Sequence, residues 1–162
     1  MAKMKTYTTA DGLAVGDLLH FGLDYISAAE TLLSSNARHF DAAGYLAHIG
    51  FELLLKAWHL HLHGHFKATH SLSELWDAIR ASADIPKMSP EHSKTFRALN
   101  AFADLRYPNL LNPIEIGSDD VLAIQDLAEA ILISMPQEMH DIIDSLVPTQ
   151  KAGRILMQRR IE

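Results

Sequence analysis

Five side chains that bind or exchange protons recur along one apolar stretch of the sequence. They are His48, Glu52, Lys56, His59 and His63, separated by four, four, three and four positions. In an α-helix this spacing places all five on one face. The face is either exposed to solvent or turned into a cleft between helices.

The two alternatives predict different chemistry for the charged pair. On a solvent face, Glu52 and Lys56 form an ordinary i,i+4 pair that contributes a few tenths of a kcal/mol. In a cleft, each buried charge needs a partner, and removing one partner costs about 3–5 kcal/mol. Arg106 is then the candidate partner for Glu52.

The histidines also raise the question of a metal. His59 and His63 are four residues apart, as are His61 and His65, and this spacing suits two imidazoles on one ion. However, Leu60 stands where the metalloprotease pattern has its glutamate, and no carboxylate is placed as a third ligand. We therefore predict no metal site and no cofactor.

The elements that must position these residues are helices. The strongest prediction is a helix over residues 40–63, with an acid near its start and Gly64 as its stop. Ser71 and Glu74 form a predicted capping box for a helix over 71–82. Ser89 and Pro90 begin a helix that runs to Arg106. The remaining helices are predicted over 13–35, 118–135 and, beyond Pro136, 137–146.

No strand pattern of useful length occurs, so we predict an all-α fold, an antiparallel up-and-down bundle of about five helices. We expect a leader over residues 1–12, the bundle over 13–147, and a tail over 148–162 that contains Arg154, Arg159 and Arg160.

Composition narrows the class of protein. The chain has 162 residues, the size of one domain, and 48% of them are hydrophobic. The absence of cysteine excludes disulfides and thiol catalysis and favours a cytoplasmic protein. A net charge of −6 argues against tight, sequence-independent nucleic-acid binding. Neither a membrane span nor a dinucleotide, P-loop, serine hydrolase or zincin motif is present.

Three segments together resemble the HEPN domain family, the higher eukaryotes and prokaryotes nucleotide-binding domains. The resemblance covers about residues 15–145. It rests on Ala43–Ala57, on His70-Ser71-Leu72 with Leu75, and on Leu105-Arg106-Tyr107-Pro108-Asn109.

The resemblance implies a helical bundle, commonly a homodimer with a cleft at the dimer interface. Many members are metal-independent RNases, often toxins of toxin–antitoxin pairs or defence nucleases, with an Arg-x4–6-His motif. In that motif the arginine steadies the phosphate and the histidine moves protons. If Arg106 is this arginine, the histidine positions hold Leu111, Asn112 and Pro113, which do no acid–base chemistry.

The leading hypothesis is therefore a non-catalytic HEPN-like homodimer that binds a nucleotide, an RNA-related ligand or a protein partner such as a nucleotidyltransferase. The candidate ligand-cleft residues are His48, Glu52, Lys56, His70, Arg106 and Tyr107. In that hypothesis Arg106 holds a phosphate, Lys56 adds charge and Tyr107 stacks on a base. The alternatives are an endoribonuclease that uses His48 or His70, and a structural assembly domain in which Glu52 and Arg106 form an internal ion pair.

Overall fold

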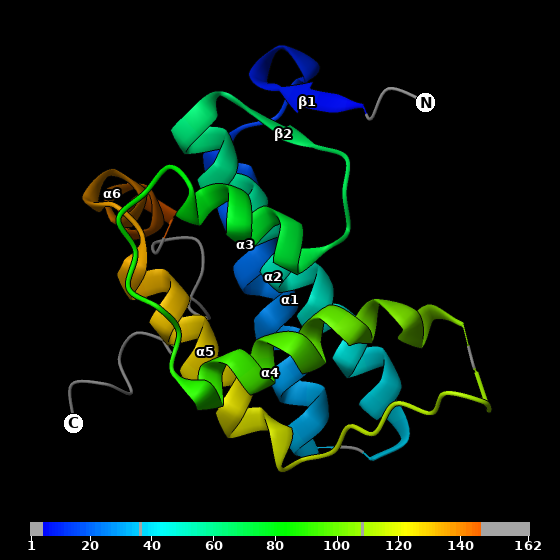
Figure 1. Cartoon of the computed structure of the whole chain (residues 1–162). Coiled ribbons are helices and arrows are strands. Elements are labelled where there is room, and N and C mark those ends of the chain that lie inside the picture. Colours follow the sequence, from blue (N-terminus) through cyan, green and yellow to red (C-terminus); the bar gives the residue numbers. More distant parts are fainter. Residues whose placement is uncertain (1–4, 36, 108, 147–162) are drawn as a thin grey trace, which may run out of the picture.

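Helices make up most of the computed structural model, which describes residues 5–35, 37–107 and 109–146. The all-α prediction is confirmed (Figure 1). The described elements are β1 (Thr6–Thr8), η1 (Thr9–Asp11), α1 (Val15–Ser35), η2 (Ala37–His39), α2 (Phe40–His63), β2 (His65–Lys67), α3 (Leu72–Arg80), α4 (Pro90–Ala101), η3 (Phe102–Arg106), α5 (Asp120–Ser134) and α6 (Gln137–Leu146).

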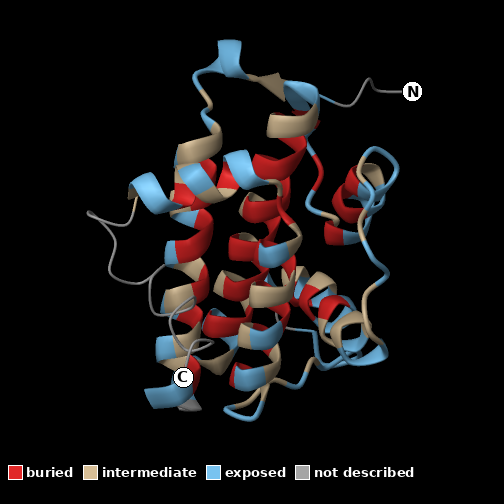
Figure 2. Cartoon of the chain, turned by 90° about the vertical axis from the view of Figure 1, so that its left-hand side faces the viewer, coloured by how far each residue is buried: buried red, intermediate tan, exposed pale blue. Residues whose placement is uncertain are grey.

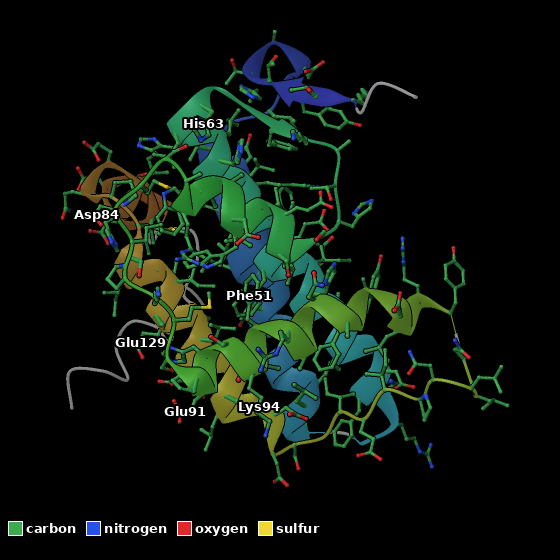
Figure 3. All side chains as sticks on the ribbon, viewed as in Figure 1. Phe51, His63, Asp84, Glu91, Lys94 and Glu129 are labelled. Atoms are coloured by element: carbon green, nitrogen blue, oxygen red, sulfur yellow. The ribbon has the colours of Figure 1, made fainter. Side chains whose placement is uncertain are left out.

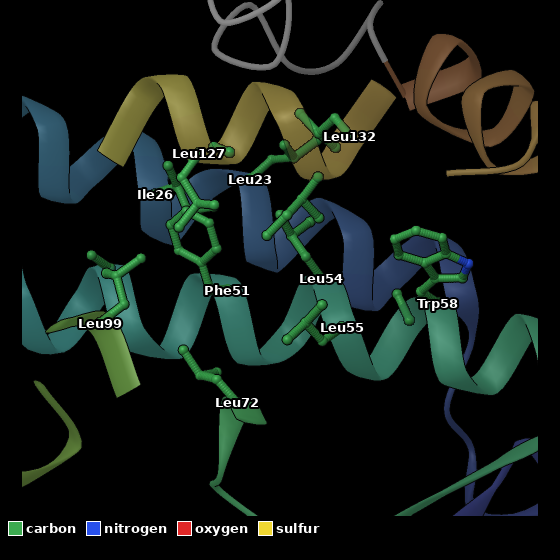
Figure 4. Packing of buried hydrophobic residues seen from close by; sticks show 14 of the residues in the cluster. Leu23, Ile26, Phe51, Leu54, Leu55, Trp58, Leu72, Leu99, Leu127 and Leu132 are labelled. Carbon is green, nitrogen blue, oxygen red and sulfur yellow. The ribbon is translucent and has the colours of Figure 1, made fainter. Parts of the chain in front are cut away.

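Helix α2 lies at the centre because nearly its whole circumference is apolar. Figure 4 shows Phe51 and Leu54 on the side of α2 that faces α1, with Phe51 pointing toward Ile26, while Leu72 and Leu99 approach α2 from its other side. All five side chains are fully buried. The buried residues gather along the helices in the interior of the molecule, and the exposed ones lie toward its outside (Figure 2).

Two glycines let α1 and α2 approach closely. A Cβ atom on Gly50 would lie 2.6 Å from the side chain of Ile26 and 2.9 Å from the carbonyl oxygen of Gly22. A Cβ on Gly22 would in turn meet the carbonyl oxygen of Gly50 at 3.0 Å. Glycine lowers helix propensity by about 1 kcal/mol relative to alanine, and here it permits backbone contact that a larger residue would prevent.

The helix ends largely follow the predicted signals. α2 begins at Phe40 and ends at His63, and Gly64 takes the left-handed conformation with φ 69°. At the start of α3, the Ser71 hydroxyl accepts a hydrogen bond from the Glu74 N–H at 3.3 Å. The Ser71 N–H donates to the Thr69 hydroxyl at 3.1 Å instead of to Glu74, so the predicted capping box is only half formed.

Three other predictions need correction or refinement. The α-helix that begins at Pro90 ends at Ala101, and the chain continues to Arg106 as the 3₁₀-helix η3. Pro136 separates α5 from α6. A short sheet is present although no strand was predicted, because β1 pairs antiparallel with β2 and each strand has three residues. Strands this short carry too little alternation to be detected.

No helix in the described ranges has the combined length and apolarity to cross a membrane. The predicted tail over 148–162 lies outside the described residues.

Candidate functional site

The polar stripe of α2 is buried. His48 is 1% exposed, Glu52 6%, and Lys56 and His59 8% each. The solvent-face alternative is therefore wrong for these four residues. His63, at the end of the helix, is exposed.

Glu52 is the centre of a cluster of polar groups. The Lys56 Nζ atom lies 2.5 Å from Glu52 Oε1. His48 Nε2 lies 3.5 Å from Glu52 Oε2, and His70 Nδ1 lies 3.1 Å from the same oxygen. Three partners from α2 and from the loop before α3 thus surround one carboxylate.

This cluster holds Glu52 in its ionised form. Burial acts to raise the pKa of Glu52, but the hydrogen bonds from His48, Lys56 and His70 and the positive charge of Lys56 outweigh it. Together they lower the pKa from 4.5 to about 2. Lys56 is also covered by Phe66 of β2, whose ring centroid lies 5.4 Å from Nζ.

Arg106 is not a partner of Glu52 among the described residues, so the predicted ion pair is wrong. Its Nε donates to the carbonyl oxygen of Ala103 at 3.3 Å. Its guanidinium carbon lies 5.8 Å from the ring centroid of Tyr45 and 5.6 Å from that of Tyr107. Two aromatic rings and one carbonyl group thus hold the side chain. Its terminal amino groups have no acceptor in the described part of the chain.

The two candidate histidines differ in what they can offer a ligand. His48 donates from Nδ1 to the Leu99 carbonyl oxygen at 2.9 Å, while its Nε2 faces Glu52. Both of its ring nitrogens are thus occupied by protein groups. The side chain of His70 is 68% exposed, and only its Nδ1 contacts Glu52. Its Nε2 has no partner within the described ranges.

A pocket of about 160 Å³ brings most of these residues together, and we call it the candidate site. Its lining contains four of the predicted residues, namely His48, Glu52, His70 and Arg106. Lys56 does not line the pocket, but it contacts Glu52, which does. Tyr107 is 73% exposed and lines a neighbouring pocket on the loop that follows η3.

Tyr45 is the polar residue of this lining that the sequence analysis missed. It lines the candidate site and contacts Arg106. It stands three positions before His48, so it continues the polar stripe one turn toward the start of α2. Extending the stripe in that direction would have identified it.

The second group of histidines lies at the opposite end of α2. The ring centroids of His59 and His63 are 4.5 Å apart, and His59 Nδ1 donates to the His65 carbonyl oxygen at 2.6 Å. Burial lowers the pKa of His59, although the hydrogen bond to His65 acts in the opposite direction. Within the described residues, no group of three or more His, Cys, Asp or Glu side chains is arranged to hold a metal ion.

The structure is thus a helical domain in which other helices pack around the central helix α2. The buried charge cluster of α2 borders a polar pocket at the surface. The chain belongs to the HEPN domain family, whose sequence model matches residues 15–138. This family is one of nucleotide-binding and RNase-type domains. No curated protein and no solved structure matches the chain.

Proposed function

We propose that this HEPN domain binds the phosphate of a nucleotide or of RNA in the candidate site, without cleaving it. The observation that carries the proposal is the position of Arg106 beside the pocket. Tyr45, Tyr107 and Ala103 hold its side chain, and its terminal amino groups are left available to a ligand. A guanidinium group that is held in position, and whose terminal amino groups have no protein acceptor, is suited to bidentate binding of a phosphate. The exposed ring of Tyr107 is available to stack on a base.

The electrostatics of the site support binding at Arg106 rather than at Glu52. The carboxylate of Glu52 would repel a phosphate, but Lys56 and the two histidines surround it. Its charge is therefore largely compensated inside the protein. Arg106 is exposed and presents the donors of its guanidinium group to the ligand.

A second candidate function, RNA cleavage, is favoured by the contact between Glu52 and His70. An ionised carboxylate that accepts the Nδ1 proton fixes the ring and leaves Nε2 available to remove the proton of a ribose 2′-hydroxyl. Arg106 would stabilise the charge that develops on the phosphate. His48 is less suited to this role because it is 1% exposed and both of its nitrogens face protein acceptors.

Binding without cleavage remains the better supported function. Cleavage also needs a proton donor for the departing 5′-oxygen. Among the described residues that line the pocket, His70 is the one imidazole with a free nitrogen. The described lining of the pocket therefore offers no second imidazole to act as the proton donor.

A thermal-shift titration with uridine and adenosine monophosphates tests the proposal. Binding at one hundred times the dissociation constant stabilises the native state by about 2.7 kcal/mol, which raises Tm by about 5–10 °C. We expect Arg106→Gln to abolish this shift and Lys94→Gln, an exposed cation on α4 outside the site, to preserve it. An equal shift in wild type and Arg106→Gln would refute the proposal.

A cleavage assay in the presence of EDTA separates the two functions. Loss of RNA that depends on His70, as judged by His70→Gln, would establish the nuclease. Intact RNA under conditions where the thermal shift shows saturation would support binding alone.

We further propose that the domain forms a homodimer, as domains of this family commonly do. Leu110 and Leu111 are 96% and 97% exposed and follow Tyr107 in the same loop. Two adjacent leucines in water favour contact with a second copy of this loop.

A further inference from the structure

A second pocket lies between α3 and α4, away from the candidate site, and we call it the α3–α4 pocket. Its volume is about 340 Å³. Arg80 comes from the end of α3, Lys87 from the loop before α4, and Arg97 from the exposed side of α4. Trp76 and Phe96, both buried, contribute apolar surface to its lining.

The charges of the α3–α4 pocket are not balanced by the protein. Neither arginine nor Lys87 lies within 4 Å of a carboxylate, among the residues that the structure describes. One carboxylate, Asp77, also lines the pocket, so three cations face one anion. This local excess is unusual in a chain whose net charge is −6. A bound anion would relieve the repulsion among the three cations.

The two pockets lie at the two ends of one row of residues on α4 and η3. Arg97, Asn100, Ala103 and Arg106 follow one another at intervals of three, and the first and last of them line the two pockets. Between them, the Asn100 side-chain oxygen accepts a hydrogen bond from the Leu72 N–H at 2.8 Å. This bond fixes the start of α3 against α4.

The separation of the two pockets sets the size of the ligand. Four α-helical steps and five 3₁₀ steps lie between Arg97 and Arg106, which corresponds to about 16 Å along the axis. Phosphates in one strand of a nucleic-acid helix are about 3.4 Å apart along its axis. A mononucleotide therefore cannot bridge the two arginines, whereas a strand of several nucleotides can.

We propose that Arg80, Lys87 and Arg97 form a subsite for a backbone phosphate of a single-stranded polynucleotide whose other end occupies the candidate site. The proposal rests on the proposed function, and it extends the ligand beyond one nucleotide. Because Trp76 and Phe96 are buried, the subsite presents charge and no exposed aromatic ring. It therefore recognises the backbone and not the base, and affinity there is independent of sequence.

Fluorescence anisotropy with a labelled oligouridylate of about ten nucleotides tests this proposal. We expect Arg80→Gln and Arg97→Gln each to weaken binding about tenfold, the effect of losing about one charged hydrogen bond. Each should also reduce the slope of log K against log salt by about 0.7. Binding of uridine monophosphate should be unchanged in both variants and lost in Arg106→Gln.

Lys94→Gln is the matched control. Lys94 is an exposed cation one turn before Arg97 on the same helix (Figure 3), and it lines neither pocket. The Lys94→Gln substitution removes one positive charge, as Arg97→Gln does, but outside the subsite. We therefore expect it to have little effect on the affinity for the oligonucleotide. An equal loss in Lys94→Gln and Arg97→Gln would mean that only overall charge matters, and it would overturn the subsite.

The remaining outcomes separate the subsite from the proposed function. If Arg106→Gln weakens both ligands and Arg97→Gln weakens neither, the subsite is refuted and the proposed function stands. If Arg106→Gln affects neither ligand, the proposed function fails, and the bridging strand fails with it. A poly-glutamate peptide of equal length that displaces the RNA at equal concentration would identify an acidic protein segment as the ligand and would also overturn the proposal.

Discussion

Replacing Glu52 with glutamine should destabilise the protein in a pH-dependent manner. The pKa of Glu52 falls from 4.5 to about 2 on folding. One pKa unit corresponds to about 1.36 kcal/mol, so ionised Glu52 contributes about 3 kcal/mol to the free energy of unfolding near neutral pH. Glutamine has nearly the same shape as the protonated acid but cannot ionise, so Glu52→Gln loses this contribution.

The direction of the pH effect follows from the lowered pKa. A carboxyl group whose pKa is lower in the folded state stabilises the protein fully above its unfolded pKa, here about 4.5. The stabilisation is lost as the pH falls from there toward 2. We therefore expect wild type to exceed Glu52→Gln by about 3 kcal/mol at pH 7 and by about 1 kcal/mol at pH 3.

Urea denaturation followed by tryptophan fluorescence at several pH values between 7 and 3 measures this difference. Trp58 and Trp76 are both buried and report on unfolding. Glu115→Gln is the control, because Glu115 is exposed in the loop before α5 and its replacement should have a small effect at every pH. A difference between wild type and Glu52→Gln that stays constant from pH 7 to pH 3 would refute the role of ionised Glu52.

Two further predictions concern packing and assembly. Gly50→Ala should lower the free energy of unfolding by about 1–3 kcal/mol, because the new Cβ would lie 2.9 Å from the backbone oxygen of Gly22. Thermal denaturation measures the effect, and Gly16→Ala is the control, since its Cβ would make an ordinary contact of 3.5 Å; equal stability in the two variants would contradict the close approach of α1 and α2. The double variant Leu110→Ser, Leu111→Ser should be monomeric at concentrations where wild type is dimeric, as measured by light scattering after size exclusion. An unchanged mass would exclude this loop from the dimer interface.

Local signals in the sequence were sufficient to predict where the helices lie along the chain. The bounds of α2 were predicted to the residue, because an apolar periodic run ends at a glycine in the left-handed conformation. The sheet was missed for the opposite reason. Tyr7 pairs with Phe66, and three residues on each strand offer no periodicity that a local pattern can reveal.

The site was predicted less completely because its contacts are distant in sequence. Periodicity placed His48 and Glu52 on one face of α2, but it did not say what covers that face. The covering groups come from elsewhere, as in the hydrogen bond from His48 to the carbonyl oxygen of Leu99. Charge alone suggested Arg106 as the partner of Glu52, whereas Arg106 is positioned by Tyr45 and Tyr107 instead.

The burial of Glu52 and Lys56 has a consequence for the function of the cluster. Removing one partner of a buried ion pair is costly, but replacing the whole pair with well-packed apolar residues often costs no stability. Stability alone therefore does not account for a carboxylate at this position. What Glu52 does that an apolar residue could not do is hold Nδ1 of His70, the one exposed member of the cluster, at the pocket that also contains Arg106. The internal charges thus fix the orientation of a surface histidine, which links the core of α2 to the ligand that we propose for the candidate site.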